Sequence, residues 1–434
     1  MAKILFAPVH VAGHFFPTIP VAHALKKRGH EVIYISEINM KDYVEGEGFT
    51  HYRVGPGVWA GNLPEKFPQV LKLRGNPRIH FILKEVYLGL APYYIKDSLP
   101  IVKREKPDLM LFDCFSYPGR LVAEITNTPW VTTAMFLGLL PSREMPPYSF
   151  GWPPPKNLLQ ELIYGFFWQG LAVYVSRYDR IINRIRKDFG LPPTPRAFLD
   201  SAGSPYLFLS FTSFGFEYYQ KHLLPQIHLV GPSLWSRPRN YQPPDWLTKF
   251  PEKRPAIYIT IGTVESVYER GFFRLAIEAF REMPDVQGVM TVCYPGKDIN
   301  GMGIPPNLRI EQYVPNSEII PKVDLVVHHA GFNTTMDCLV HSKPAVAIPM
   351  EGDQHENGRR VQVSGVGYRV PYRSLTPEKL RQAIRKALKD ESLKANVAKL
   401  SQQINKLNGP ETSADLIEKF LKTGKPVYRS ESGK

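Results

Sequence analysis

The sequence contains little cysteine, and the cysteines it has follow no recognisable pattern. Cys114, Cys293 and Cys338 are the only three among 434 residues, and they lack the spacing of a zinc ligand set. A disulfide framework would need paired cysteines and an oxidising compartment. We therefore expect three reduced thiols in a cytoplasmic protein.

Targeting and membrane-spanning signals are also scarce. The first nine residues contain a short apolar run, but Gly13 and His14 follow it, without a basic flank or a small-residue cleavage site. Residues 157–176 carry Glu161 as their only charge, at a length that suits a membrane span. Because polar residues and two glycines interrupt this stretch, we expect a buried or interfacial helix rather than a span.

Three nucleotide-binding motifs are missing as well. No Gly-x-Gly-x-x-Gly follows the first predicted strand, which argues against NAD or FAD, and there is no P-loop. The chain has no Asp-x-Asp pair of the kind that bridges a divalent metal to a diphosphate. We therefore expect no cofactor and no required metal.

Basic residues are in excess, with 54 Lys and Arg against 40 Asp and Glu and a formal net charge of +14. Such an excess suits nucleic acid, anionic lipid or an anionic small molecule. No Lys/Arg block interleaved with aromatic residues is present, and no zinc-finger or RNA-recognition signature. We expect no nucleic-acid partner, which leaves anionic lipid and anionic substrates.

The chain does have a regular alternation of apolar strands and amphipathic helices, in two blocks. The first block opens with a strand at 4–8, a helix at 17–28 and a strand at 31–35, and the second begins with a strand at 256–261. This alternation predicts an α/β fold with doubly wound parallel sheets. The length is too great for one ordinary core, so two domains are expected.

The predicted linker is a stretch rich in Pro, Arg and Trp that lacks periodicity. The expected parts are an N-terminal domain at 1–230, the linker at 231–255, a C-terminal domain at 256–410, a last helix at 411–422 and a polar tail at 423–434. Further strands are expected at 109–112, 130–134, 207–210, 288–294, 308–312, 325–328 and 345–349. Further helices are expected at 118–125, 158–189, 272–281, 333–341, 377–389 and 393–407.

The most informative segment is His-Ala-Gly-Phe-Asn-Thr-Thr-Met-Asp, from His329 to Asp337, followed by Asp353-Gln354. It has the pattern of a strand end, a tight glycine turn and the first turn of a helix. A helix N-terminus presents unpaired N–H donors and a partial positive charge, which suit a pyrophosphate. An ordinary N-capped helix fits the turn alone equally well, but the Asp-Gln pair one βα unit further on favours a nucleotide site.

This segment resembles the donor-binding signature of family 1 nucleotide-sugar glycosyltransferases. That signature runs from Trp/Tyr-x-Pro-Gln through His-x-Gly-x-Asn-Ser/Thr and an acidic residue to Asp-Gln, and here Tyr313-Val314-Pro315-Asn316 stands for the first element. The resemblance covers nearly the whole chain and is similar to the bacterial branch of macrolide and zeaxanthin glycosyltransferases. It implies the GT-B architecture, in which two Rossmann-like domains face a central cleft and the last helix crosses back to the first domain.

The resemblance also implies roles on the donor side. Tyr313 would stack on the base, backbone near Val314 would hold the base edge, and Asp337 would hold the ribose. The implied donor-binding set is Thr263, Tyr313, Val314, His329, Gly331, Asn333, Thr334, Asp337, Asp353 and Gln354. The alternatives are a core aromatic for Tyr313, a strand-end turn for Thr263 and a helix N-cap for Asp353.

Two departures from the signature leave the donor open. Family members often have Glu where this chain has Asp337, and Gln where it has Asn316. A UDP-sugar is the expected donor, with a dTDP-sugar as the alternative, and the sugar itself is not defined.

A second motif supplies a candidate catalytic base. Gly13-His14-Phe15-Phe16-Pro17 follows the first strand and resembles the Gly-His-x-x-Pro element that carries the family's catalytic histidine. An imidazole titrates near neutrality and benefits from a carboxylate that fixes its tautomer. The resemblance implies Asp113, at the end of strand 109–112, as that partner. The alternatives are a loop histidine bonded to backbone, and Asp113 as a helix N-cap.

The acceptor side is less clearly defined. Phe136 and Trp152 are the candidate acceptor-binding residues, with core packing as the alternative for each. Residues 141–155 look similar to a loop of carotenoid glucosyltransferases. The apolar stretch 157–176 is followed by basic residues at 177–187, which leaves open a peripheral contact with an anionic membrane.

The sequence thus predicts an inverting, nucleotide-sugar-dependent glycosyltransferase that acts on a hydroxyl of a hydrophobic small molecule or lipid. Two alternatives remain: a non-hydrolysing nucleotide-sugar epimerase, and a non-catalytic nucleotide-sugar-binding subunit. Neither alternative would need His14 and Asp113 in these roles.

Overall fold

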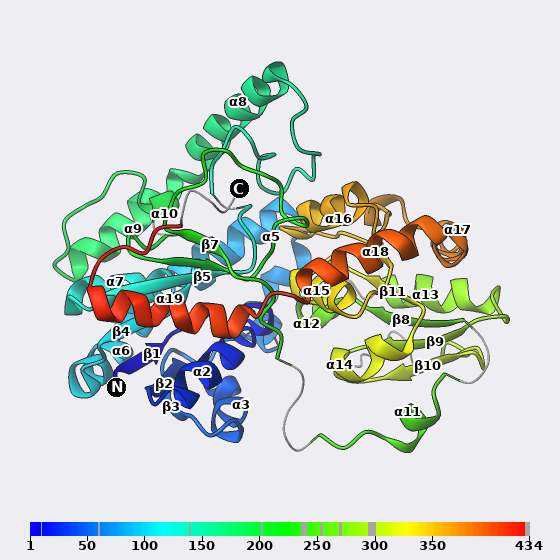
Figure 1. Cartoon of the computed structure of the whole chain (residues 1–434), viewed down its shortest axis with the longest axis horizontal. Coiled ribbons are helices and arrows are strands. Elements are labelled where there is room, and N and C mark those ends of the chain that lie inside the picture. The colour runs from blue at the N-terminus through cyan, green and yellow to red at the C-terminus, as the bar shows by residue number, and fades with distance from the viewer. Residues whose placement is uncertain are drawn as a thin grey trace. The chain divides into compact units, whose positions relative to one another are not determined.

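The computed structural model describes residues 1–9, 11–59, 61–138, 140–200, 203–235, 241–251, 255–268, 271–293 and 301–429. The chain divides into two units. One comprises Met1–Pro147, Pro154–Trp235 and Leu407–Lys434, and the other comprises Tyr148–Pro153 and Ser236–Lys406. Each unit is built around one parallel sheet with helices packed against it (Figure 1).

The N-terminal unit holds a seven-stranded sheet in the order β3-β2-β1-β4-β5-β6-β7. Its strands are β1 (Lys3–Phe6), β2 (Glu31–Ser36), β3 (Thr50–Arg53), β4 (Leu109–Asp113), β5 (Trp130–Ala134), β6 (Phe208–Ser210) and β7 (Ile227–Leu229). Every pairing is parallel. Its first six strands follow the Rossmann order.

The helices of this unit connect its strands. They are α1 (Ala12–Phe15), α2 (Thr18–Lys27), α3 (Lys41–Gly46), α4 (Leu63–Lys66), α5 (Asn76–Phe81), α6 (Ala91–Glu105), α7 (Tyr117–Thr126), α8 (Leu158–Val175), α9 (Arg177–Asp188), α10 (Ala197–Asp200) and α19 (Gly409–Thr423), with a π-helical turn η3 (Ile82–Leu88). No helix in the described part of the chain combines the length and the hydropathy that a membrane span needs.

The C-terminal unit repeats the pattern with six strands in the order β10-β9-β8-β11-β12-β13. They are β8 (Ala256–Thr260), β9 (Gln287–Thr291), β10 (Leu308–Glu311), β11 (Leu325–His328), β12 (Ala345–Ala347) and β13 (Gly367–Arg369). The helices are α11 (Asp245–Lys249), α12 (Gly262–Tyr268), α13 (Gly271–Arg281), α14 (Asn316–Ile319), α15 (Phe332–Val340), α16 (Gln354–Val363), α17 (Pro377–Lys389) and α18 (Glu391–Ile404). Its strands also pair in parallel, which confirms the predicted α/β class with two doubly wound sheets.

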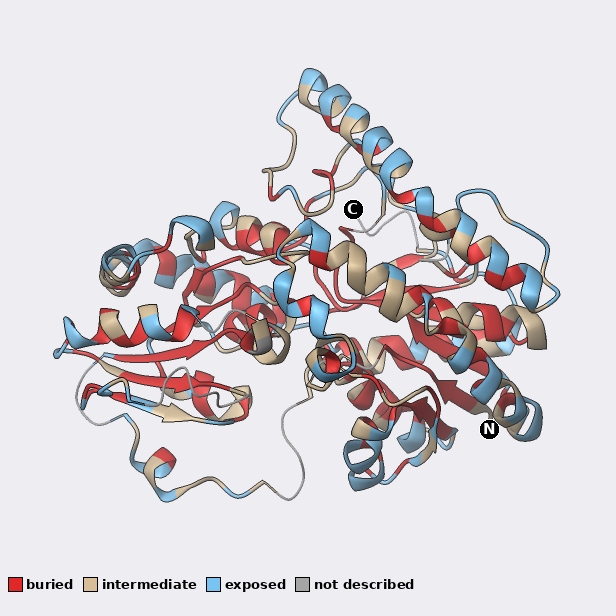
Figure 2. Ribbon diagram, turned by 180° about the vertical axis from the view of Figure 1, so that it is seen from behind, coloured by how far each residue is buried: buried red, intermediate tan, exposed pale blue. Residues whose placement is uncertain are grey.

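The central strands are apolar because both faces of each sheet are covered. Every residue of β4, β8 and β11 is buried, as expected for strands inside a parallel sheet. Helix α13 packs Phe272, Ile277 and Phe280 into the core of the C-terminal unit. In Figure 2 the strands of both sheets are coloured mostly as buried. The predicted strands and helices lie within a few residues of observed ones. The elements that were not predicted include the strands β3, β7 and β13, the helices α6 and α16, and several helices of four to seven residues.

The last helix belongs to the N-terminal unit, where α19 packs against α2. Arg28, which follows α2, forms ion pairs with Glu411, Asp415 and Glu418 of α19. His30 adds a second contact with Glu418, at 3.1 Å. These charged contacts hold the last helix against α2, although the residues that form them are nearly 400 positions apart in the sequence.

The strand orders define where ligands are expected. In a doubly wound sheet the order of the strands reverses at a switch point, and ligands bind at the carboxyl ends of the two strands that flank it. The switch points are β1/β4 in the N-terminal unit and β8/β11 in the C-terminal unit. Asp113 is the last residue of β4, and His14, Thr263 and His329 follow the other three strands.

Candidate functional site

The switch point of the N-terminal sheet carries a histidine–aspartate pair. His14 lies on the short helix α1 after β1, and Asp113 is the last residue of β4, paired directly beside β1. His14 Nδ1 lies 2.9 Å from Asp113 Oδ2. The structure therefore brings together two residues that are 99 positions apart, as the sequence predicted.

The surroundings of this pair fix the orientation of the imidazole. The Asp113 side chain is fully buried, whereas the His14 side chain is 23% exposed. The second carboxylate oxygen, Oδ1, accepts a hydrogen bond from Phe115 N at 2.9 Å, and the Phe115 ring meets the imidazole edge-on. A carboxylate accepts only, so Nδ1 carries the proton and Nε2 is the basic nitrogen.

The switch point of the C-terminal sheet holds the predicted pyrophosphate turn. His329 is buried after β11, and burial lowers the pKa of its imidazole to about 4. The preceding His328 is also buried, with a pKa lowered to about 3, and its Nδ1 accepts from Ala330 N at 3.1 Å. Ala330 has a φ of +66°, a conformation that costs energy for a residue with a Cβ.

Two glycines make room for the His329 ring. A Cβ on Gly331 would lie 2.3 Å from His329 Nε2, and a Cβ on Gly262 would lie 2.7 Å from His329 Cε1. The missing side chain at Gly331 thus makes room for the histidine of the same turn. Gly262 is the first residue of α12 and follows β8, the strand that pairs with β11, so the segments after these two strands together enclose this ring.

Helix α15 begins at this turn, with Gly331 as its N-cap residue and no side-chain cap. Asn333 is partly exposed and Thr334 is buried in its first turn. Thr335 closes the turn by donating to Gly331 O at 2.9 Å. The backbone N–H groups of this first turn point out of the helix end, where they can bind an anion.

Asp337 lies one turn further along α15. Asn316 Nδ2 donates to Asp337 Oδ2 at 2.8 Å, which joins the two positions where the chain departs from the family pattern. Desolvation raises the pKa of Asp337 to about 7, and the Asn316 hydrogen bond opposes that rise. Tyr313 is 52% exposed, which suits a stacking surface better than a core aromatic, and Val314 is buried.

The Asp-Gln pair begins α16. Gln354 is buried, and its Oε1 accepts from Met350 N at 2.9 Å and from Glu351 N at 3.3 Å. This side chain therefore shapes the loop before the helix. Asp353 Oδ2 accepts from Asn357 Nδ2 at 2.8 Å, one helical turn on.

Thr263 lies in α12, a helix where only a strand-end turn was expected. The backbone at Gly262 turns with a φ of +74°, and Gly262 N donates to Thr260 Oγ1 at 3.3 Å. Thr263 is partly exposed, and it follows Gly262, which lies against the His329 ring.

Residues 148–153 form a strap that belongs to the C-terminal unit, although the sequence placed them in the N-terminal domain. Gly151 N donates to Glu356 Oε1 at 3.3 Å, and Arg359 Nε donates to Gly151 O at 2.8 Å. Desolvation raises the pKa of the buried Glu356 to about 8. The strap thus packs on α16, directly after Asp353-Gln354, and these contacts were missed because they join residues about 200 positions apart.

The two candidate acceptor residues lie in different units. Phe136 is buried after β5 in the N-terminal unit, with its ring against Gly138. Trp152 belongs to the strap of the C-terminal unit and contacts Phe150 edge-on. The sequence placed both residues in one domain, whereas the structure assigns them to different units. Their roles in acceptor binding stay predictions.

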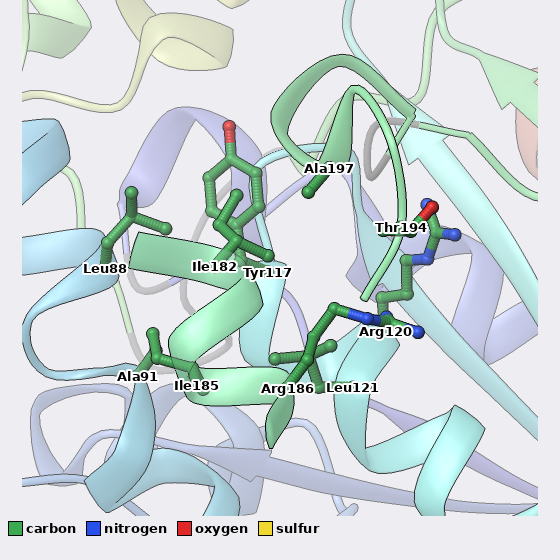
Figure 3. Close-up of a pocket in the computed structure, with 10 residues that line it drawn as sticks. All are labelled: Leu88, Ala91, Tyr117, Arg120, Leu121, Ile182, Ile185, Arg186, Thr194 and Ala197. Atoms are coloured by element: carbon green, nitrogen blue, oxygen red, sulfur yellow. The ribbon is translucent and has the colours of Figure 1, made fainter. Parts of the chain in front are cut away.

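A cavity in the N-terminal unit is separate from these residues (Figure 3). It is lined by Leu88, Ala91, Tyr117, Arg120, Leu121, Ile182, Ile185, Arg186, Thr194 and Ala197, and has room for about one water molecule. The two arginines pair with Glu124, at 2.7 Å and 2.8 Å. No predicted site residue lines it, so we regard it as a packing gap between helices.

Comparison with known proteins identifies relatives of the whole chain. Residues 281–419 match the family described as erythromycin biosynthesis protein CIII-like, C-terminal domain. The chain is 27% identical over 430 residues to 4'-demethylrebeccamycin synthase of Lentzea aerocolonigenes, covering 96% of this chain and 99% of the relative. It is 24% identical over 420 residues to the zeaxanthin glucosyltransferase of Pantoea ananas, covering 94% and 93%.

Solved structures agree on the fold. The kitacinnamycin glycotransferase matches with a TM-score of 0.74 at 18% identity, covering 97% of this chain and 99% of its own. The spinosyn rhamnosyltransferase complexed with thymidine diphosphate matches with a TM-score of 0.69 at 18% identity, covering 96% and 100%. The chain is therefore similar in sequence, over nearly its whole length, to bacterial macrolide and zeaxanthin glycosyltransferases, and it has the two-domain GT-B fold.

Proposed function

We propose that this glycosyltransferase transfers a sugar from a nucleotide-sugar to a hydroxyl of a hydrophobic small molecule, by a single displacement with inversion. The hydrogen bond between His14 and Asp113 at the β1/β4 switch point is the observation that carries the proposal. An epimerase or a non-catalytic binding subunit gives this pair no role.

In the proposed reaction, His14 Nε2 takes the proton of the acceptor hydroxyl while its oxygen attacks the anomeric carbon. The bond between that carbon and the nucleoside diphosphate breaks in the same step, and the diphosphate leaves with the electron pair. Asp113 stabilises the imidazolium that forms and holds its tautomer. One displacement inverts the anomeric centre, and no covalent sugar–enzyme intermediate is needed.

The leaving diphosphate would be stabilised at the start of α15. Backbone N–H groups of a helix N-terminus suit an anion, and a neutral His329 still donates one N–H. The low pKa of His329 supports a neutral ring at physiological pH. Asn333, Thr334 and Thr263 would add donors around the same group.

We further propose a pyrimidine nucleoside diphosphate sugar, with UDP preferred over dTDP. Tyr313 would stack on the base, Val314 backbone would hold its edge, and Asp337 would accept from the ribose hydroxyls. The thymidine diphosphate in the spinosyn rhamnosyltransferase supports the class of donor. Asp353 and Gln354 would face the sugar hydroxyls.

No metal is required in this proposal, because helix N–H groups and histidine supply the stabilisation that a metal would give. The acceptor class rests on the relatives, whose names include a zeaxanthin glucosyltransferase and a rebeccamycin-type synthase.

The proposal is tested by nucleoside diphosphate release from UDP-glucose and dTDP-glucose with a mixture of hydrophobic alcohols. We expect acceptor-dependent release, and a product that is heavier by one hexose in mass spectrometry. His14→Ala should lower release at least about a hundredfold while calorimetry still detects UDP binding. Release by His14→Ala at the wild-type rate would show that the base is assigned wrongly.

A further inference from the structure

Helices α8 and α9 together form one long, nearly continuous helix. They are separated only by Ser176, whose φ of −60° and ψ of −17° remain in the helical region. Figure 1 shows this rod with α8 projecting from the rest of the N-terminal unit. Because the two helices are nearly coaxial, side chains spaced by three or four residues lie on one continuous face from residue 158 to 187.

The inner face of this rod is packed against its own unit. Tyr164 and Trp168 are buried, and Trp168 Nε1 donates to Met145 O at 3.0 Å. In α9, Tyr178 and Ile182 are buried, and His80 Nδ1 lies 2.7 Å from the Tyr178 hydroxyl. The opposite face is therefore a true outer surface, since the core contacts of both helices are already made.

The outer face is apolar along α8. Seven large apolar side chains are exposed there: Leu158, Leu159, Leu162, Ile163, Phe166, Val173 and Tyr174. Phe166 and Val173 are 74% and 75% exposed, and their spacing of seven residues puts them on one line. Exposed residues dominate this face in Figure 2. A row of large apolar side chains over four to five turns is a contact surface rather than scattered surface hydrophobicity.

The same line becomes basic along α9. Arg177, Arg180, Arg184 and Lys187 are exposed and continue the spacing of three and four residues, and Asp188 is the exposed carboxylate beside them. At the junction, the Arg177 guanidinium lies 3.7 Å from the Tyr174 ring centroid. Lys156 adds an exposed cation just before the start of α8.

We propose that this face is a membrane-docking surface, on which α8 lies in the outer layer of an anionic bilayer while α9 contacts the lipid headgroups. A helix with an apolar face lies parallel to the membrane with that face in the acyl boundary. Cations next to it add electrostatic attraction to an anionic surface. The excess of basic residues over the whole chain acts in the same direction.

The charge pattern favours lipid over a second copy of the chain. Two rods packed in parallel would bring their basic halves together, which is repulsive. Two rods packed antiparallel over α8 would cover the apolar half but give the four cations of α9 no partner. An anionic bilayer satisfies both halves of the face at once.

The experiment is co-sedimentation of the full chain with vesicles, at low and at high salt. Wild-type protein should sediment with vesicles of phosphatidylcholine and phosphatidylglycerol, and much less with pure phosphatidylcholine. Leu162→Ser with Phe166→Ser should lower binding at least tenfold, and Arg180→Glu with Arg184→Glu on the order of a hundredfold. High salt should weaken binding because it screens the charges.

A matched control reverses two exposed lysines elsewhere, Lys386→Glu with Lys389→Glu in α17. It makes the same change in net charge and should leave binding within about twofold if the surface is specific. Equal loss in this control would overturn the proposal, as would equal binding to neutral vesicles or none to anionic ones. The remaining alternative is that the face binds a second copy of the chain, which light scattering detects as a dimer. If the protein does not bind vesicles, and Leu162→Ser with Phe166→Ser converts a dimer to a monomer, the face belongs to a second copy and the proposal is overturned.

Discussion

The substitution Asp113→Asn tests the catalytic pair with almost no change in shape. In the wild type, Asp113 Oδ2 accepts from His14 Nδ1 and Oδ1 accepts from Phe115 N, both at 2.9 Å. An asparagine can keep the bond to Phe115 through its carbonyl. Its amide group would then donate toward His14 Nδ1, which must become an acceptor. The proton moves to Nε2, and the nitrogen that should accept from the acceptor hydroxyl is lost.

The size of the effect follows from the bond that is lost. A hydrogen bond to a charged group contributes about 1.5–3 kcal/mol, which corresponds to a factor of about ten to a hundred in rate. The wrong tautomer adds to this, so we expect kcat to fall about a hundredfold or more. His14→Ala sets the lower limit, because it removes the base entirely.

The assay is the initial rate of nucleoside diphosphate release at saturating donor and acceptor, together with UDP calorimetry. UDP affinity should be unchanged, since the donor residues lie in the C-terminal unit. Asp108→Asn is the matched control: its carboxylate accepts from Lys3 N at 2.7 Å and does not touch His14. A wild-type kcat in Asp113→Asn would refute the proposed role of the pair, and an equal loss in Asp108→Asn would point to a general effect on the fold.

Three further predictions concern the donor unit. The pKa of Asp337 is raised to about 7, so the stability that its protonated form contributes is present below pH 4 and lost as pH rises through about 7. Relative to wild type, Asp337→Asn should therefore gain up to about 4 kcal/mol in free energy of unfolding between pH 5 and pH 8, measured by chemical denaturation. A difference in free energy of unfolding between variant and wild type that is the same at pH 5 and at pH 8 would contradict this. Gly151→Ala should loosen the strap, because the added Cβ would lie 2.8 Å from His355 O and the backbone has a φ of +60°. Limited proteolysis should then cut this variant at residues 148–153. Gly170 has open space around it, so the control Gly170→Ala should be cut like the wild type. A chelator should leave transfer unchanged, and activity that disappears and returns with a divalent cation would contradict the metal-free mechanism.

The sequence predicted the α/β fold because its central strands are strongly apolar and its helices are amphipathic. It missed β3 and β7, which are edge strands of four and three residues with partly exposed side chains. It also missed α16, whose polar sequence resembles a loop although Glu356 and Arg360 are buried within it. Their burial depends on contacts with distant parts of the chain, which local patterns do not report.

The site was predictable where function leaves a local motif. The His14 and His329 motifs each follow a strand, and strand ends are where α/β folds bind ligands. The packing of the His329 ring between Gly262 and Gly331 was not predictable, because it depends on two strands pairing in space. The strap was not predictable for the same reason, and the outer face of α8 became visible only when its inner face was found packed.

A single displacement at the anomeric carbon determines the configuration of the product. This configuration is read from the proton NMR coupling constant of the anomeric hydrogen in the product formed from UDP-α-glucose, or from dTDP-α-glucose if that donor is used. We expect a β-linked product from an α-linked donor. An α-linked product would contradict a single displacement, because retention requires a second displacement or a different mechanism from the one that His14 and Asp113 support.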